Sequence, residues 1–169
     1  MPNGDYPSLE GVIRQLAQDR FEHITMAVNH QAELSRAFFG DGSKWNLRID
    51  YSLEEKPLGT IGPLRLIPDL PSHFLVMNGD VLTDIDFGEF YRTHSDANRL
   101  FTISSYERAQ HVDFGVRVSG EGGTLRDFKE KPTSTFEVSM GVYMVSREIL
   151  PLIPIGQPYG FDNLMHDLL

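Results

Sequence analysis

Asp80 has the clearest chemical potential in this sequence, because it follows a short apolar run directly. The run spans residues 74–77 and leads into Asn78, Gly79 and Asp80. Four consecutive apolar residues predict a strand buried on both faces, and ligands of open α/β sheets bind outside the carboxyl ends of the strands. A carboxylate there suits Mg²⁺, which also binds phosphate oxygens. The alternative is a plain turn, which Asn-Gly alone would favour.

A second group of charged residues follows an expected strand at residues 124–128. Glu130 and Lys131 stand side by side before Pro132. The carboxylate could bind a sugar hydroxyl, and the lysine could bind a phosphate as a compact point charge. The alternative is an ordinary solvated run of charges, which is the better interpretation of this segment when it is taken alone.

A third segment, residues 54–62, is a loop that contains Gly59 and Gly62. Glycines allow a backbone to approach a flat ligand such as a nucleobase closely. A simple loop before a helix explains the segment about equally well. Residues 40–44 superficially resemble a phosphate-binding loop, but they follow an expected helix and precede an expected strand. That order is the reverse of what phosphate loops require, so we reject this interpretation.

Composition narrows the class of protein. The chain has 169 residues, 40% of them apolar and 23% charged, which predicts one globular domain over residues 1–169. The net charge of −9 argues against a nucleic-acid partner. Cysteine is absent and the six histidines show no ligand spacing, so they are assigned no metal. Neither a signal peptide nor a run of membrane-spanning length is found, and we expect a cytoplasmic protein.

Hydrophobic periodicity predicts the order of the elements. Residues 9–17 carry apolar side chains with helical spacing, and Asp86 can cap a further helix. Strands and helices alternate in the first half, whereas the second half is rich in strands. This order predicts an α/β fold with a mostly parallel sheet and an antiparallel insertion. The expected strands are residues 24–28, 47–51, 74–77, 100–105, 114–118, 124–128 and 138–145.

Taken together, the motifs resemble those of sugar-1-phosphate nucleotidyltransferases, and most of all the bacterial mannose-1-phosphate guanylyltransferase-like proteins. The resemblance covers essentially the whole chain and implies a Rossmann-like nucleotidyltransferase fold. It rests on residues 29–33, 39–42, 57–62, 78–80, 114–115, 130–132 and 141–143.

The resemblance implies a role for each matching residue. Asp80 would hold the Mg²⁺ cofactor, and Lys131 would bind the sugar phosphate. The implied nucleotide-binding residues are Glu54, Pro57, Leu58, Gly59, Thr60, Gly62 and Gly79. The implied sugar-binding residues are Gly115, Glu130, Ser139 and Gly141. Ser139 departs from the family pattern, because many members carry an asparagine there.

Glu54 bears on which base is bound. A carboxylate only accepts hydrogen bonds, and guanine offers two adjacent donors, N1–H and N2–H. Uracil and thymine offer one N–H between two carbonyls. The residue therefore favours GTP over UTP and dTTP. In the implied reaction, a sugar-1-phosphate oxygen attacks the α-phosphorus of the nucleoside triphosphate and pyrophosphate leaves.

The sequence lacks two segments that the family normally has: an initial strand with a glycine-rich, Arg-bearing loop, and a later metal-binding aspartate. We therefore expect a domain truncated at both ends, with little activity as this chain and with an exposed sheet edge through which copies could associate. Three interpretations stay open. The chain is a fragment of a nucleotidyltransferase domain, a non-catalytic relative that binds a sugar nucleotide or has a regulatory role, or a domain completed by a second chain.

Overall fold

The computed structural model describes residues 2–3, 6–28 and 32–169, and the chain divides into two compact units. Unit 1 comprises Met1–Thr102 and Val142–Leu169, and unit 2 comprises Ile103–Gly141. The expectation of a single domain over residues 1–169 stays a prediction. Among the described residues, no helix combines the length and the apolar character needed to cross a membrane.

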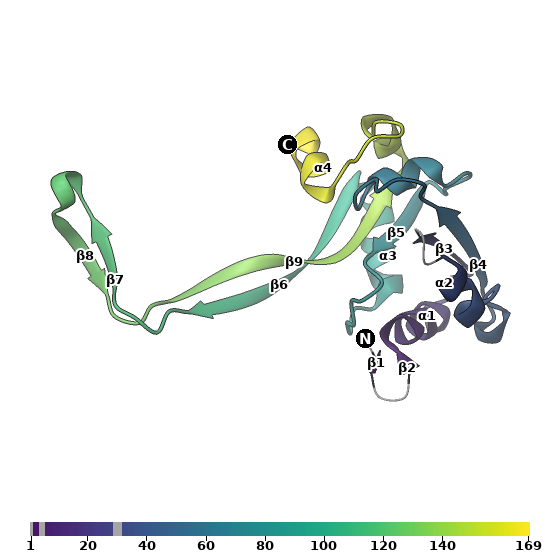
Figure 1. Ribbon diagram of the computed structural model, residues 1–169, viewed down its shortest axis with the longest axis horizontal. Helices are drawn as coiled ribbons and strands as arrows, with labels where there is room; N and C mark the ends of the chain where they lie inside the picture. The colour runs from purple at the N-terminus through teal and green to yellow at the C-terminus, as the bar shows by residue number, and fades with distance from the viewer. Residues whose placement is uncertain (1, 4–5, 29–31) are drawn as a thin grey trace. The chain divides into compact units, whose positions relative to one another are not determined.

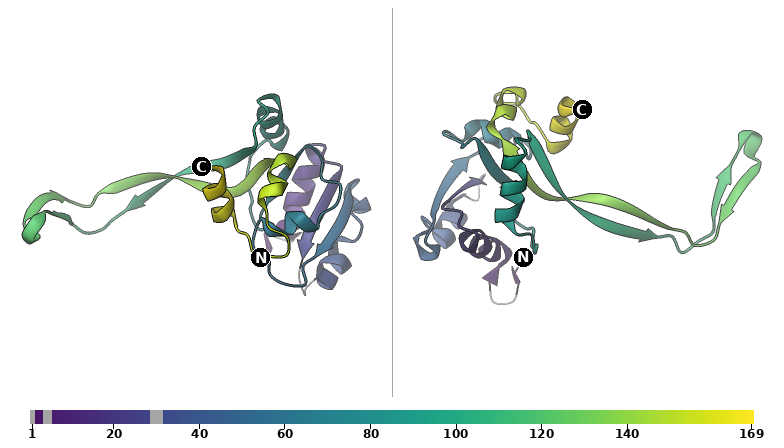
Figure 2. Two further views of the ribbon diagram at one scale, coloured as in Figure 1. Left: turned by 90° about the horizontal axis from the view of Figure 1, so that it is seen from above. Right: turned by 180° about the vertical axis from the view of Figure 1, so that it is seen from behind.

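The first part of unit 1 is a helix packed on a parallel pair of strands. Helix α1 spans Ser8–Gln18, and strands β3 (His23–Val28) and β4 (Arg48–Leu53) pair in register, with Ile24 opposite Ile49. The predicted apolar face of α1 is confirmed, because Ile13 is buried among residues of both strands. Figures 1 and 2 show this helix beside the two strands.

The second part of unit 1 is organised around strand β5 (His73–Met77). It pairs antiparallel with β9 (Thr133–Ser146), which also pairs with β6 (Phe101–His111). The predicted strand at residues 74–77 is thereby confirmed, but the expectation that both its faces are buried is wrong, because only Phe74 is buried and the other three residues are half-buried. A core forms where this sheet meets the C-terminal segment, which contains the 3-10 helix η4 (Arg147–Leu152) and helix α4 (Phe161–Leu168).

The remaining helices of unit 1 follow the expected signals. Helix α3 (Phe87–Asp96) begins at the predicted cap, where the Asp86 side chain accepts a hydrogen bond of 2.7 Å from the Glu89 N–H. Helix α2 spans Ala32–Phe39 and is followed by Gly40, whose φ of 58° suits a helix end. The other short elements are β1 (Pro2–Asn3), β2 (Tyr6–Pro7), η1 (Ser43–Trp45) and η2 (Gly62–Leu66).

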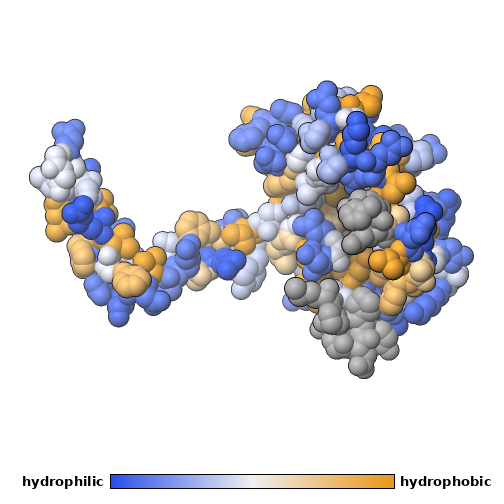
Figure 3. Space-filling model, in the orientation of Figure 1, coloured by the Kyte–Doolittle hydropathy of each residue, from blue (hydrophilic) through white to orange (hydrophobic). Residues whose placement is uncertain are grey.

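Unit 2 is an antiparallel two-stranded ribbon. Its far end is the predicted hairpin, formed by β7 (Val116–Ser119) and β8 (Leu125–Lys129) around the short helix η3 (Glu121–Gly123). Several large apolar side chains of the ribbon are exposed, and Figure 3 shows them interspersed with polar residues. The most exposed of them are Tyr106, Phe114, Leu125, Phe128 and Phe136.

The α/β class is confirmed, but the expectation of a mostly parallel sheet is wrong for the described strands, because one pairing is parallel and three are antiparallel. Strands β3 and β4 are the parallel pair, whereas β5 with β9 and β7 with β8 are antiparallel. In the sheets that the structure describes, β3 and β5 each have a strand on one edge only. The parallel pair and the three-stranded sheet are therefore not joined by backbone hydrogen bonds.

Candidate functional site

Asp80 lies where the sequence predicted it, in the segment that directly follows β5. This segment is also a turn, because the Asn78 carbonyl accepts a hydrogen bond from the Val81 N–H at 3.4 Å. Gly79 faces α1, and a Cβ at this glycine would lie 3.5 Å from the Leu9 side chain. The turn is confirmed, and it presents Asp80 to solvent at a strand end; a role for Asp80 in metal binding stays a prediction.

The surroundings of Asp80 limit the kind of metal site it can form. Within the described part of the chain, no three His, Asp or Glu residues gather to hold a metal ion. Asp80 is exposed and belongs to none of the ion pairs found there. Mg²⁺ commonly keeps several waters and binds through one or two carboxylates together with substrate phosphates. By itself, Asp80 could supply one carboxylate ligand to Mg²⁺.

Glu54 begins the predicted nucleotide-binding loop immediately after β4. Its N–H donates to the Val28 carbonyl at 2.8 Å, which continues the pairing of β4 with β3. Its Oε2 accepts a hydrogen bond from the Leu58 N–H at 3.1 Å. The half-buried carboxylate thus closes a short loop in which Pro57 is exposed and Leu58 is buried. This bond orients Glu54 and leaves its second oxygen available to another donor.

The next part of the loop is fixed by Tyr159, which sequence reasoning missed. The Tyr159 carbonyl accepts hydrogen bonds from the N–H groups of Ile61 (3.1 Å) and Gly62 (2.9 Å). Its own N–H donates to the Leu58 carbonyl at 2.8 Å. Gly59 has a φ of 78°, and a Cβ there would lie only 2.8 Å from the Tyr159 carbonyl oxygen. The glycine is required for this close approach of two backbones.

Two side chains strengthen the same connection. The Thr60 hydroxyl oxygen accepts a hydrogen bond of 3.0 Å from the N–H of Phe161, the first residue of α4. The Tyr159 hydroxyl donates to Asp167, also in α4, at 2.5 Å. Burial and the Asp167 carboxylate together raise the pKa of Tyr159 to about 12. Tyr159 and helix α4 are therefore both bonded to the glycine-bearing loop and to each other.

In unit 2, Gly115 and Glu130 lie together. A Cβ added to Gly115 would overlap the Phe128 ring and lie 3.2 Å from Oε2 of Glu130. Lys131 follows with a φ of 43°, a left-handed conformation that turns the chain sharply between β8 and β9. These residues form the corner cluster, defined as Gly115, Glu130 and Lys131. It contains two residues predicted to bind the sugar, Gly115 and Glu130, and Lys131, predicted to bind the sugar phosphate, which follows Glu130 in the chain.

Ser139 and Gly141 form a separate pair in β9. The Gly141 N–H donates to the Ser139 hydroxyl oxygen at 3.3 Å, and Gly141 has a φ of 76° inside the strand. Ser139 lies six positions beyond Thr133, the first residue of β9, which is beside the corner cluster. At about 3.3 Å per residue this distance is about 20 Å. The structure therefore brings the predicted sugar-binding residues together in two places.

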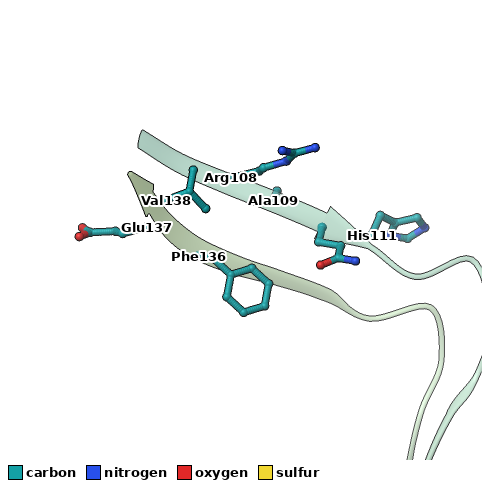
Figure 4. Close-up of a pocket in the computed structure, with 7 residues that line it drawn as sticks. Arg108, Ala109, His111, Phe136, Glu137 and Val138 are labelled. Carbon is teal, nitrogen blue, oxygen red and sulfur yellow. The ribbon is translucent and has the colours of Figure 1, made fainter. Parts of the chain in front are cut away.

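A hollow in the middle of the ribbon contains none of the predicted site residues. Its volume is about 740 Å³, and Figure 4 shows the side chains of β6 and β9 around it. The lining residues are Arg108, Ala109, Gln110, His111, Phe136, Glu137 and Val138. Another predicted motif, at residues 29–33, falls partly on residues 29–31, which lie outside the described residues.

Comparison with known proteins identifies the family. The family model described as "Nucleotidyl transferase" matches residues 1–157. The chain belongs to this family, the sugar-1-phosphate nucleotidyltransferases. It is 30% identical to a UTP–glucose-1-phosphate uridylyltransferase of Synechocystis, over 93% of this chain and 45% of the relative. It is 27% identical to a mannose-1-phosphate guanylyltransferase of Mycobacterium tuberculosis, over 96% of this chain and 46% of the relative.

Solved structures show the same fold. HddC from Yersinia pseudotuberculosis superposes with a TM-score of 0.65 at 20% identity, over 95% of this nucleotidyltransferase chain and 76% of that one. Its complex with GMP-PN gives a TM-score of 0.64 at 21% identity. The predicted nucleotidyltransferase fold is thereby confirmed. The chain spans less than half the length of the curated relatives named above.

Proposed function

We propose that this chain carries sites for transfer of a nucleotidyl group to a sugar-1-phosphate, with GTP and mannose-1-phosphate as the favoured substrates. A phosphate oxygen of the sugar-1-phosphate attacks the α-phosphorus, the bond to the bridging oxygen breaks, and pyrophosphate leaves. The family and its relatives support the reaction class. They include both a guanylyltransferase and a uridylyltransferase, so the choice of nucleotide rests on residues of this chain.

The orientation of Glu54 carries the preference for guanine. Its Oε2 is held by the Leu58 N–H at 3.1 Å, so the carboxylate is already fixed before a nucleotide binds. A fixed carboxylate can accept from the adjacent N1–H and N2–H of guanine. It meets carbonyl oxygens beside the single N–H of uracil or thymine, and two facing acceptors repel. Gly59, Thr60 and Gly62 belong to the same anchored loop, which would present its backbone to the base.

The phosphates and the sugar are assigned to two further places. Asp80 would hold Mg²⁺, which supplies charge neutralisation and Lewis acidity to the transferring phosphate when it is bound. In the corner cluster, Glu130 would accept from sugar hydroxyls and Lys131 would bind the sugar phosphate. The proposal also includes a contact of Gly79 with the nucleotide. It includes contacts of Ser139 and Gly141 with the sugar.

The same residues predict slow turnover by these 169 residues alone. The proposed phosphate contacts comprise one carboxylate, Asp80, and one lysine, Lys131. A triphosphate carries several negative charges, and catalysis of its transfer depends on positioning and neutralisation. We therefore expect this chain to bind the nucleotide measurably but to turn it over slowly. The experiment below distinguishes slow catalysis from a role in binding a sugar nucleotide only.

Calorimetric titration tests the nucleotide. The chain is titrated with GTP, ATP, UTP and dTTP, each with and without Mg²⁺, and then with GDP-mannose. We expect GTP to bind most tightly and Mg²⁺ to strengthen its binding. Asp80→Asn should remove the Mg²⁺ effect while leaving the order of bases unchanged. Glu54→Gln should remove the preference for GTP while leaving the Mg²⁺ effect. Tighter binding of UTP or dTTP by the unaltered chain would refute the guanine assignment.

Release of pyrophosphate from GTP and mannose-1-phosphate then tests catalysis. Slow release of pyrophosphate supports the proposed transferase function if the substitution Lys131→Ala abolishes it. Tight binding of GDP-mannose with no release at any enzyme concentration supports the binding role instead. Lys129→Ala is the matched control, because Lys129 is an exposed lysine at the end of β8, outside the corner cluster.

A further inference from the structure

Asn78 and Gly79 lie side by side in the turn that follows β5, and the proposed function gives the Asn78 side chain no role. Both residues are exposed. The turn is closed by the bond from the Val81 N–H to the Asn78 carbonyl, whose 3.4 Å is long for a hydrogen bond. Residues 78–86 contain no helix or strand. Little in the local structure therefore restrains the Asn78 side chain or the peptide group that follows it.

The N–H group that follows Asn78 differs from those that follow other asparagines. Among the hydrogen bonds of the described residues, none uses the Gly79 N–H. After Asn46, Asn98 and Asn163, by contrast, the next N–H already donates to a backbone carbonyl. These bonds run from Leu47 to Gly42 (3.4 Å), from Arg99 to His94 (3.2 Å) and from Leu164 to Gly160 (3.2 Å). The nitrogen of Gly79 is thus available for a reaction that the other three nitrogens are held back from.

The available reaction is attack of that nitrogen on the Asn78 side chain. The nitrogen of the next residue and the side-chain amide carbon Cγ of an asparagine can close a five-membered ring, and their covalent connection supplies the proximity. A glycine in the second position lets the backbone rotate into the attacking geometry, and it has no side chain to obstruct the approach. Leu47, Arg99 and Leu164 each carry a side chain. Sequence and hydrogen bonding therefore both single out Asn78.

We propose that Asn78 is a site of spontaneous modification, at which it is converted to aspartate or isoaspartate with loss of ammonia. The Gly79 nitrogen forms a bond to Cγ of Asn78, the bond from Cγ to Nδ2 breaks, and ammonia leaves with the proton of the Gly79 nitrogen. Water then adds to one of the two carbonyl carbons of the resulting succinimide ring and breaks its bond to nitrogen. Addition at Cγ restores the backbone through the α-carbonyl and gives aspartate. Addition at the α-carbonyl leaves the chain running through Cγ and gives isoaspartate.

The effect of this modification on the site rests on the proposed function of Asp80, whereas the modification itself does not. Isoaspartate inserts one additional carbon, about 1.5 Å of chain, between β5 and Asp80. Mg²⁺ demands nearly ideal positions of its ligands. We therefore expect the isoaspartate form to lose the strengthening of GTP binding by Mg²⁺. Asn78→Asp adds the same negative charge without lengthening the backbone, and it should keep that strengthening.

Peptide mapping by mass spectrometry tests the proposal on the whole chain after incubation for weeks at neutral pH. Trypsin releases residues 66–92, which contain Asn78 and no other asparagine or glutamine. This peptide should gain one mass unit and divide into two products, identified against synthetic aspartate and isoaspartate peptides. Residues 93–99, which contain Asn98, are the internal control and should convert at least about tenfold more slowly. Asn3 precedes Gly4, which lies outside the described residues, and is released in a separate peptide, residues 1–14.

A variant of the chain provides an independent measurement. The Cβ that Gly79→Ala adds would lie 3.5 Å from the Leu9 side chain, an ordinary contact, and the variant should convert Asn78 about tenfold or more slowly. Gly11→Ala is the matched control, because its Cβ would lie 3.6 Å from the Leu82 side chain. It should convert Asn78 like the unaltered chain. Circular dichroism checks that both variants fold, and the comparison of Asn78 with Asn98 in the unaltered chain decides the matter if one does not.

Two results would overturn the proposal: no mass gain in residues 66–92, or conversion of Asn98 as fast as that of Asn78. Equal conversion of Asn78 in folded Gly79→Ala and in the unaltered chain would do the same. The converted chain carries one more negative charge, so anion exchange separates it for calorimetry with GTP and Mg²⁺. If its isoaspartate form binds GTP with undiminished strengthening by Mg²⁺, the proposed role of Asp80 is contradicted and the modification site stands.

Discussion

Glu54 and Leu58 are joined by a hydrogen bond of 3.1 Å, in which the Glu54 carboxylate accepts from the Leu58 N–H. The side chain proposed to read the base therefore also closes the loop that carries it. Leu58 in turn accepts through its carbonyl from the Tyr159 N–H at 2.8 Å. Two adjacent hydrogen bonds thus link the residue proposed to recognise the base to the C-terminal segment.

Substitutions of Glu54 should separate its structural role from recognition. Glu54→Ala leaves the Leu58 N–H without its acceptor, and we expect a loss of about 1 kcal/mol in the free energy of unfolding. Glu54→Gln retains an acceptor oxygen and should be close to unaltered in stability. Urea denaturation of the three proteins measures both effects. If the alanine and glutamine variants lose equal free energy of unfolding, the hydrogen bond to Leu58 contributes nothing to stability.

Gly59→Ala should be strongly destabilising. The alanine would have to adopt a left-handed backbone conformation, and its Cβ would lie 2.8 Å from the Tyr159 carbonyl oxygen. We expect a loss of about 3 kcal/mol in the free energy of unfolding, from backbone strain and overpacking together. Gly40→Ala is the matched control, because Gly40 has a φ of 58° and open space around it. It should cost about 1 kcal/mol. Similar losses at both positions would contradict the close contact with Tyr159.

The Tyr159–Asp167 pair should make the protein sensitive to alkaline pH. The pKa of Tyr159 is raised from 10.0 to about 12 by burial and by Asp167. The folded state therefore retains the phenolic proton more tightly than the unfolded state does. The corresponding stability is complete below pH 10 and is lost as pH rises from 10 to about 12. Urea midpoints across that range should depend less on pH in Tyr159→Phe, whereas Tyr106→Phe, at an exposed site, should behave like the unaltered chain.

His94 should make the protein sensitive to mild acid. It is fully buried in α3, its Nδ1 lies 2.8 Å from the Thr102 hydroxyl oxygen, and its ring meets that of His73 edge-on. Burial, with smaller contributions from His73 and Arg99, lowers the pKa of His94 below 6.5. The unfolded state therefore takes up the proton first, and stability is lost as pH falls below about 6.5.

Denaturation between pH 5 and pH 8 measures this effect. His94→Gln should flatten the pH dependence of the urea midpoint, even if the midpoint itself is lower. His166→Gln is the control, because His166 is exposed in α4. An unchanged slope in His94→Gln would exclude His94 as the source.

Local patterns were sufficient to predict α1, β5 and the start of α3. The helical spacing around Ile13 predicted α1, and the apolar run before Asn78 predicted β5, because each signal is contained within a few neighbouring residues. The cap at Asp86 was likewise predicted, since a capping side chain and its N–H lie three residues apart.

Contacts between distant residues could not be predicted in this way. Tyr159 lies about a hundred positions beyond the loop it anchors, and nothing in its immediate sequence marks it. The adjacency of Gly115 and Glu130 arises from pairing of β7 with β8, whereas the separation of Ser139 from them arises from the length of β9. The motifs suggested one sugar site, and the strand geometry divides it into two places.

The amino-acid sequence by itself determined the family, the α/β class and the positions of the candidate site residues along the chain, because motifs and periodicity are local properties. Only the tertiary structure decided which of those residues meet and which strand edges stay unpaired. Those outcomes depend on strand register, and register is set by packing between segments far apart in the chain. The contact of Gly59 with Tyr159 is an example of residues that meet, and β3 and β5 are examples of strands with one unpaired edge in the described sheets.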